Sequence, residues 1–354
     1  MPKISTMFMI LLLALLMVSN ELNAQQKTRW QEIIRATPYY SSIGFTNNLM
    51  DIRRWVLLSN GYCEVAQRHI VFDRRGAFLG WMSNPEDPED RQQKLNELRE
   101  RLYNEKAVAD WLPGAEQLSG YPFALSCDQP DVDLDAAIER LLVRDVWGTW
   151  DGLVAGSEDK PVSLIDTAQL VWNHRQLQLK EPLDAIDFSL FLAQLIIESG
   201  AKKRALSRVN AIGILQLRES VLKDCNIPER HWRHRMAQVD CSVRLYVLNR
   251  RNIEPLFTQA FGHLPEQKRN RLFSILLMQT YHSGIGNMKR LLTDTDQGRA
   301  TAYFALHHEK FTAEDIATGM IFHNLGRAPW GWESLYYLID IEIAEQTLCQ
   351  RITC

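Results

Sequence analysis

An almost wholly apolar helix that ends in one carboxylate is the feature that most constrains the fold of this chain. Between Ile186 and Ile197 apolar residues cover nearly every face of a helix, which predicts that the segment is buried inside a domain. Gly200 is the residue type that most often ends a helix. Glu198 then lies in the last turn, where apolar neighbours and the helix dipole both disfavour its charged form. The pattern predicts a raised pKa, suited to a general acid near neutral pH. The alternative is an ordinary helix-end glutamate whose carboxylate reaches water.

The rest of the C-terminal half shows helical periodicity almost throughout. Short loops marked by Gly, Pro or Asn separate the segments. The expected helices are 184–199, 215–225, 236–251, 268–282, 285–293, 299–306, 313–323 and 333–347. We therefore predict a mainly α protein with an α-helical domain over 183–354. The domain boundary is expected between Gln176 and Leu183, where Pro182 breaks a helix.

The segment 27–180 has a mixed character and predicts a smaller α+β domain. Helices are expected at 30–36, 47–58, 91–104 and 133–143, strands within 70–81 around a turn at 73–76 and at 121–127, and a surface loop at 147–160. This segment contains no catalytic or binding motif that we recognise, so its role is unknown. A cell-envelope protein that docks on this half is one partner that we consider.

The first 24 residues are typical of a secretory signal peptide. Lys3 gives the positive start, an apolar stretch at 7–18 follows, and Ala24 closes a small-residue cleavage site. The apolar stretch is shorter than the roughly 20 residues that span a membrane, although an uncleaved anchor stays open. We therefore expect a periplasmic or secreted protein.

Six cysteines in an exported chain favour disulfides, and the sequence alone leaves their connectivity open. They are Cys63, Cys127, Cys225, Cys241, Cys349 and Cys354. Pairing each cysteine with its nearest neighbour keeps every bridge within one expected domain, so we prefer that arrangement. The cysteines and histidines show no metal-ligand spacing, and we expect neither a metal site nor another cofactor.

The net charge of −3 hides an uneven distribution along the chain. Twelve Lys and Arg residues against four acids give the segment 202–251 a charge of +8, next to the helix that carries Glu198. Such a zone attracts an anionic polymer, or it is simply a solvated face. We expect no nucleic-acid partner, because the chain is predicted to be exported and shows no motif that reads DNA or RNA.

Four short motifs follow one another in the C-terminal half. They are Glu198-Ser199-Gly200, then SRVNAIGILQL at 207–217, then QTYHSGIGN at 279–287, and finally ESLYY at 333–337. In order and spacing these motifs resemble the catalytic domain of soluble lytic transglycosylases, which shares the lysozyme-like fold of goose-type lysozymes. The resemblance covers about 170 C-terminal residues. Each motif is weak alone, but four in the right order are specific.

The resemblance implies that Glu198 is the single catalytic acid. It would protonate the β-1,4 glycosidic oxygen between N-acetylmuramic acid and N-acetylglucosamine in the glycan strands of peptidoglycan. Its conjugate base would then accept the proton of the muramic C6 hydroxyl, which closes a 1,6-anhydro ring. No second carboxylate serves as nucleophile, in contrast with most glycosidases. The substrate-binding residues that the resemblance implies are Ser199, Gly213, Gln216, Tyr281, Gly284 and Tyr337.

Each of these residues also has an ordinary structural interpretation. A glutamine can bond loop backbone, a glycine can allow a positive φ, and a tyrosine can fill a core. The motifs also depart from the family pattern: His282 and Ser283 replace Asn-Ala, Ile285 and Glu219 replace prolines, and Asn210 replaces a glycine. Two alternatives therefore stay open. One is a hydrolase on the same fold that attacks muramic or chitin-like glycans with water, and the other is a non-catalytic glycan-binding protein of the cell envelope.

Overall fold

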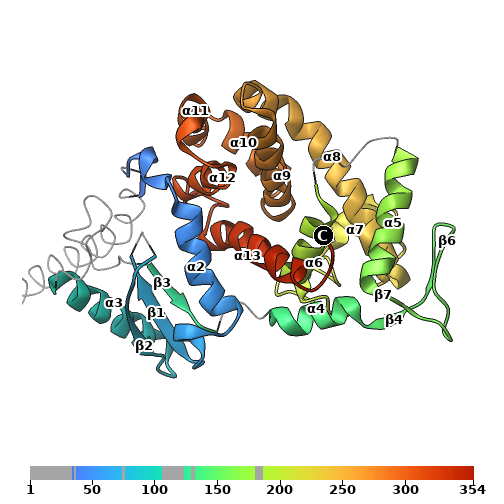
Figure 1. Ribbon diagram of the computed structural model, residues 1–354, viewed down its shortest axis with the longest axis horizontal. Coiled ribbons are helices and arrows are strands. Elements are labelled where there is room, and N and C mark those ends of the chain that lie inside the picture. Colours follow the sequence, from blue (N-terminus) through green and yellow to red (C-terminus); the bar gives the residue numbers. More distant parts are fainter. Residues whose placement is uncertain (1–33, 36, 74–75, 106–122, 129–131, 180–185) are drawn as a thin grey trace, which may run out of the picture.

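The computed structural model describes residues 34–35, 37–73, 76–105, 123–128, 132–179 and 186–354 (Figure 1). Over these residues the protein is mainly helical, as the sequence predicts. The expected signal peptide at 1–24, most of the helix at 30–36 and the boundary at 180–183 lie outside the described residues. None of the helices in the described part of the chain combines the length and the apolar character that crossing a membrane requires.

Helix α6 (Phe188–Ser199) is the central helix of the fold. Most of it is buried, and Phe191, Leu195 and Ile196 have no solvent-exposed surface. Gly200 follows in the left-handed conformation, with φ 61° and ψ 31°, and its N–H bonds to the Ile196 carbonyl at 2.6 Å. Because glycine adopts this conformation at little steric cost, the helix stops where the sequence predicts.

Further helices follow α6 in the C-terminal half (Figure 1). They are α7 (Glu219–Asp224), α8 (Arg235–Phe261), α9 (Glu266–Ser283), α10 (Ile285–Thr293), α11 (Arg299–Leu306), α12 (Ala313–Phe322) and α13 (Trp332–Cys349). Helix α13 lies along α6, and α8 and α9 pack against each other. Helix α8 continues through Pro255 to Phe261, beyond the end at 251 that the sequence predicts, and its last turns bury Phe257 and Phe261.

Helices from the N-terminal segment pack directly on the C-terminal helices. They are α2 (Phe45–Leu57), α4 (Leu134–Leu142) and α5 (Leu164–Leu179). Helix α2 contacts α12 and α13, α4 contacts α6, and α5 lies along α8. A single hydrophobic core includes buried residues from Ile34 to Leu348. The core therefore does not divide at the boundary near residue 180 that the sequence predicts.

Polar contacts also tie α2 to the C-terminal helices. The Asp315 carboxylate of α12 accepts bonds from the backbone N–H groups of Gly44 and Thr46, at 2.8 and 3.1 Å, and so caps the start of α2. Further along α2, Arg53 donates two bonds to the Asp340 carboxylate of α13, at 2.7 and 2.6 Å. The side chains of this ion pair are only 3% and 7% exposed. Helix α2 is thus part of the helical body.

A small antiparallel sheet forms the α+β part of the N-terminal segment (Figure 1). Its strand order is β2 (Phe78–Ser83), β1 (Arg68–Phe72), β3 (Phe123–Ser126). Helix α3 (Pro88–Asn104) covers one face, where Leu95, Leu98 and Leu102 pack on Val71. Ile70, also on β1, belongs to the main core. Since β1 contributes to both cores, the sheet connects α3 to the helical body.

The segment 144–163 forms two short antiparallel pairs of strands. One pairs β4 (Arg144–Val146) with β7 (Val162–Ser163), and the other pairs β5 (Gly148–Trp150) with β6 (Leu153–Ala155). The expectation of a surface loop over 147–160 is therefore wrong for residues 148–155, which form the β5–β6 hairpin. Asp151 and Gly152 both have positive φ, 48° and 79°, and they form the two-residue turn of a hairpin. This Asp-Gly signal was present in the sequence.

All six cysteines are paired, each with its nearest neighbour in the sequence. The disulfides are Cys63–Cys127, Cys225–Cys241 and Cys349–Cys354. The first closes the base of the segment that contains the sheet and α3, with 5.2 Å between its Cα atoms. The second joins the end of α7 to α8, and the third closes the C-terminal tail after α13.

Candidate active site

Glu198 lies in the last turn of α6 and is half-buried. Its carboxylate is enclosed by protein atoms, although part of the residue still reaches solvent. This burial raises the pKa of Glu198 to about 7, and the hydrogen bond from Tyr337 opposes part of the rise. Near neutral pH a substantial fraction of this side chain is therefore protonated, which is the state that a general acid requires.

Tyr337 of α13 holds the carboxylate of Glu198 from one side. Its hydroxyl donates to Glu198 Oε1 at 2.7 Å and accepts from Gln194 Nε2, also at 2.7 Å. Gln194 lies one turn before Glu198 on α6 and is fully buried. The ring of His282 stacks on Tyr337 with 4.3 Å between the centroids. The chain of contacts fixes the phenol, and through it the orientation of the acid.

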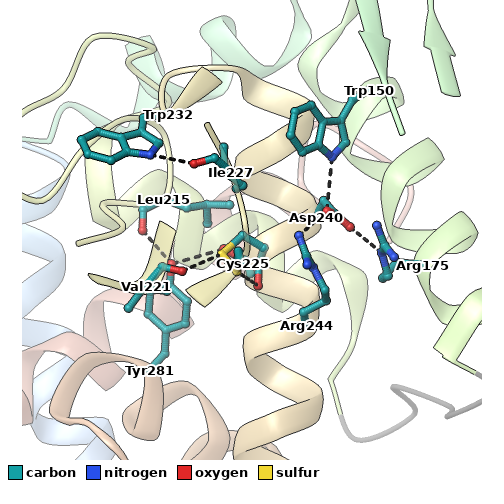
Figure 2. Close-up of a disulfide and its surroundings, with 12 residues drawn as sticks. Trp150, Arg175, Leu215, Val221, Cys225, Ile227, Trp232, Asp240, Arg244 and Tyr281 are labelled. Atoms are coloured by element: carbon teal, nitrogen blue, oxygen red, sulfur yellow. Dashed lines mark hydrogen bonds and ion pairs between the residues drawn. A yellow bond between two sulfur atoms is a disulfide. The ribbon is translucent and has the colours of Figure 1, made fainter. Parts of the chain in front are cut away.

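Tyr281 of α9 lies beside this network and fixes the loop that follows α6. Its hydroxyl donates to the Leu215 carbonyl at 2.7 Å and lies 3.3 Å from the Ser242 hydroxyl (Figure 2). The ring of Tyr246, on α8, stacks on Tyr281 at 5.6 Å. Burial raises the pKa of Tyr246 and of Tyr281, and the negative charge of Glu198 raises both values further. Both tyrosines therefore stay neutral across the physiological pH range.

The loop 201–218 is built on hydrogen bonds to buried side chains. The Ser199 hydroxyl donates to the Ile214 carbonyl at 2.7 Å, and Gln238 accepts from the Leu215 N–H at 3.1 Å. Gln238 Nε2 also donates to the Ile212 carbonyl at 2.9 Å. A Cβ at Gly213 would lie 2.1 Å from Gln238 Nε2. Glycine is therefore required by the close approach of Gln238, and this contact accounts for Gly213 without a ligand.

The same loop explains why the next helix begins late. Leu217 forms a β-bridge with Ile212, so the helix expected from 215 begins only at Glu219. Gln216 has a positive φ of 46°, and its Nε2 donates to the Gly213 carbonyl at 2.8 Å. Its side chain is half-buried and serves the turn.

Gly284 lies between α9 and α10 with φ 83° and ψ 149°, a conformation that essentially only glycine adopts. It is exposed, and a Cβ there would have no other atom within 4 Å. Backbone conformation, rather than packing, therefore requires the glycine.

The structure thus brings the predicted residues into two groups. Tyr337 contacts Glu198 directly, whereas Ser199, Gly213, Gln216 and Tyr281 shape or hold the adjoining loop. The residues that complete these contacts were not predicted from the sequence, and they are Gln194, Gln238, Ser242 and Tyr246. A buried polar side chain inside an apolar helix, such as Gln194, is the signal that could have drawn attention to one of them.

Within the described residues no carboxylate perturbs the pKa of Glu198. Asp240 is a buried residue of α8. Its side chain is 2% exposed, pairs with Arg175 and Arg244, and accepts a bond from the Trp150 indole at 3.2 Å (Figure 2). Glu219 pairs with Lys223 on the surface of α7.

The histidine and acid side chains of the described segments are not grouped to bind a metal ion in sets of three or more. His231 and His234, the one pair near the loop, have ring centroids 5.8 Å apart and stand beside Trp150. The chemistry that this arrangement can perform is proton donation and acceptance by one carboxyl group whose pKa is near 7.

Neither a protein-family model nor a curated protein sequence matches this chain.

Proposed function

We propose that the protein is a glycan-cleaving enzyme in which Glu198 is the catalytic acid and base, and that it acts on peptidoglycan as a lytic transglycosylase. The observation that carries this proposal is the environment of Glu198. The carboxyl group is enclosed by protein atoms, which raises its pKa to about 7 and lets it hold a proton near neutral pH, while the residue as a whole is only half-buried. Tyr337 fixes its orientation.

In the proposed reaction, protonated Glu198 donates its proton to the β-1,4 glycosidic oxygen as the bond to the muramic C1 breaks. The resulting carboxylate accepts the proton of the muramic C6 hydroxyl, whose oxygen attacks C1 and closes the 1,6-anhydro ring. Glu198 ends the cycle protonated again. A pKa near 7 suits a group that must first give and then take a proton in one cycle.

Among the described residues no carboxylate shifts the pKa of Glu198, which supports this reaction over hydrolysis of the retaining type. A retaining glycosidase needs a second carboxylate about 5 Å from the first, and an inverting one needs it about 6.5–9.5 Å away. Asp240 is committed to Arg175 and Arg244. The alternative to be tested is hydrolysis, in which Glu198 protonates the same glycosidic oxygen and a water molecule attacks C1.

Product analysis distinguishes these functions. Purified protein incubated with peptidoglycan sacculi is expected to release muropeptides that end in 1,6-anhydro-muramic acid. A hydrolase would release the same fragments one water heavier, with reducing ends. A protein that binds sacculi but releases no fragments would be the non-catalytic glycan-binding protein.

A further inference from the structure

The loop after the candidate acid presents an exposed cluster of positive charge. Its cations are Lys202, Lys203, Arg204 and Arg208, all exposed, and Arg218 follows at the end of the loop. The sequence contains no acid between Ser199 and Arg218. Within the part of the chain that the structure describes, none of these five cations forms an ion pair. Other cations of the segment 202–251 form ion pairs, for example Arg235 with Asp145 and Lys223 with Glu219.

This segment, residues 202–210, is a preformed turn, which we call the cationic turn. The Ser207 N–H donates to the Ala211 carbonyl at 2.9 Å, and the Ser207 hydroxyl accepts from the N–H groups of Val209 and Ala211, at 3.2 and 2.9 Å. Asn210 takes the left-handed conformation, with φ 60°, that closes the turn. Local hydrogen bonds therefore fix the backbone that carries the cations, so binding of an anion orders their side chains but not the turn itself.

Two backbone contacts attach the cationic turn to the candidate active site. The Lys202 N–H donates to the Ser199 carbonyl at 3.3 Å, and the Gly213 N–H donates to the Ala205 carbonyl at 2.9 Å. Lys202 lies four positions after Glu198 in the chain, so their Cα atoms are at most about 14 Å apart even if the chain were fully extended. Any polymer held at Glu198 thus has its substituents within reach of these cations.

Two aliphatic side chains accompany the charges. Leu206 is 59% exposed and Val209 is 65% exposed, and both lie among the cations of the turn. A ligand that matches this surface carries several anionic groups separated by small apolar ones. The stem peptides of peptidoglycan, which alternate alanine methyl groups with free carboxylates, have this chemistry.

We propose that the cationic turn binds the carboxylate-bearing stem peptide of the glycan whose sugar chain lies at Glu198. This inference rests on the proposed function and adds a preference to it: the enzyme selects glycan that still carries its peptides. A stem of three to five residues extends about 10–18 Å from the sugar, which matches the reach of the turn. Arg204 and Arg208 can each hold a carboxylate in a bidentate contact.

The test compares cleavage of two substrates by the full chain. One is peptidoglycan glycan with its stem peptides, and the other is the same glycan after an amidase has removed them. The variant Arg204→Gln/Arg208→Gln removes two charges from the turn. The matched control Lys94→Gln/Lys310→Gln removes two exposed charges from α3 and from the short helix His308–Lys310.

Wild type is expected to cleave peptide-bearing glycan faster than peptide-free glycan at low salt. The ratio of the two rates should fall about three- to tenfold in the Arg204→Gln/Arg208→Gln variant, as expected for two exposed ion pairs. Added salt at about 0.5 M should lower the wild-type ratio in the same direction. The control variant should keep the wild-type ratio. An equal ratio in wild type and the turn variant overturns the inference.

A binding measurement separates this inference from the proposed function. Free stem peptide titrated into the full-length protein by NMR should shift the amide signals of 202–210, and the turn variant should bind it three- to tenfold more weakly. If wild type cleaves no glycan, the proposed function fails while the titration still decides the inference. If the turn variant loses binding to phosphatidylglycerol vesicles but keeps its peptide affinity, the surface is a lipid-docking site and the inference is wrong.

Discussion

The hydroxyl of Tyr337 donates a hydrogen bond of 2.7 Å to Oε1 of Glu198 and thereby joins α13 to the end of α6. The two residues are separated by 139 positions in the sequence. The bond stabilises the charged form of the carboxyl group, while burial stabilises the neutral form, and burial has the larger effect. Their balance holds the pKa of Glu198 at about 7, the property on which the proposed chemistry depends.

Activity is expected to fall as the pH rises through about 7. The proposed first step needs protonated Glu198, and the protonated fraction decreases above its pKa. A profile of kcat/KM against pH on a soluble glycan should therefore show a limb with an apparent pKa near 7. A rate that stays constant from pH 6 to pH 9 would contradict this assignment.

Tyr337→Phe is expected to move this limb to higher pH. The variant removes the hydrogen bond that lowers the pKa of Glu198, so the carboxyl group should keep its proton further into the alkaline range. We also expect a loss of about tenfold in the maximal rate, equivalent to about 1.4 kcal/mol, because the acid is less well oriented. Tyr303→Phe is the matched control, since Tyr303 of α11 packs against Tyr39 and not against Glu198. A limb at the same pH in Tyr337→Phe and wild type would refute the assignment of this bond.

The raised pKa of Glu198 should also affect the stability of the folded protein, which can be measured without substrate. The pKa of Glu198 is about 7 in the folded protein against 4.5 for the ordinary side chain. The folded state therefore holds the proton more tightly, and the stability that this contributes is complete below pH 4.5 and lost as the pH rises through 7. Glu198→Gln stays neutral and loses none of it.

In urea unfolding, the free energy of unfolding of Glu198→Gln relative to wild type should therefore rise between pH 4 and pH 8. The expected gain is on the order of 2–3 kcal/mol, from 1.36 kcal/mol for each pKa unit. Leu192→Ala, a deletion in the buried part of α6, should show a difference that does not change with pH. A pH-independent difference for Glu198→Gln would mean that its pKa is not raised.

The ion pair between Arg53 and Asp340 should be essential to the attachment of α2. Both side chains are buried, so Arg53→Met leaves an unpaired carboxylate and is expected to cost about 3–5 kcal/mol of unfolding free energy. The double variant Arg53→Met/Asp340→Leu should recover most of this loss, because it replaces both charges with apolar groups. If the double variant is as unstable as Arg53→Met, the loss does not come from the unpaired Asp340 carboxylate, and this account of the ion pair is wrong.

The fragment 183–354 is expected not to fold. The sequence suggested an independent domain there, but in the structure α2 and α5 bury residues of α13 and α8, and Asp315 caps α2. Removing those helices would expose core side chains along both partners. Far-UV circular dichroism with a urea titration should show no cooperative transition for the fragment, whereas the full chain should unfold cooperatively. A cooperative transition in the fragment would restore the two-domain interpretation.

Much of the helical fold could be predicted from local pattern. The apolar periodicity and Gly200 located α6, and an Asp-Gly turn could have located the β5–β6 hairpin. The sequence did not indicate that Phe257 and Phe261 continue α8, because Pro255 normally ends a helix. Periodicity describes one segment at a time and cannot show which buried faces meet.

The residues of the candidate site likewise include some that local sequence predicts and others that only the fold brings together. Glu198 was predictable, since a lone carboxylate in an apolar helix is a local signal. Gln194 and Gln238 were not, because their bonding partners, Tyr337 and the loop around Gly213, lie 143 and about 25 residues away and meet them only after folding. Gly213 illustrates the difference: the resemblance implied a contact with substrate there, and the structure shows a positive φ and a close approach of Gln238.

The most direct measurement is the mass of the products that wild type and Glu198→Gln release from peptidoglycan sacculi. Wild type should release muropeptides that end in 1,6-anhydro-muramic acid, each lighter by one water than a hydrolysed fragment. Glu198→Gln should keep the fold and release at least about 10²–10⁴-fold less product, because the amide can neither give nor accept the proton. Reducing ends in the wild-type products would make the protein a hydrolase. Release by Glu198→Gln at the wild-type rate would contradict the central claim, since both reactions need the same proton from the same residue.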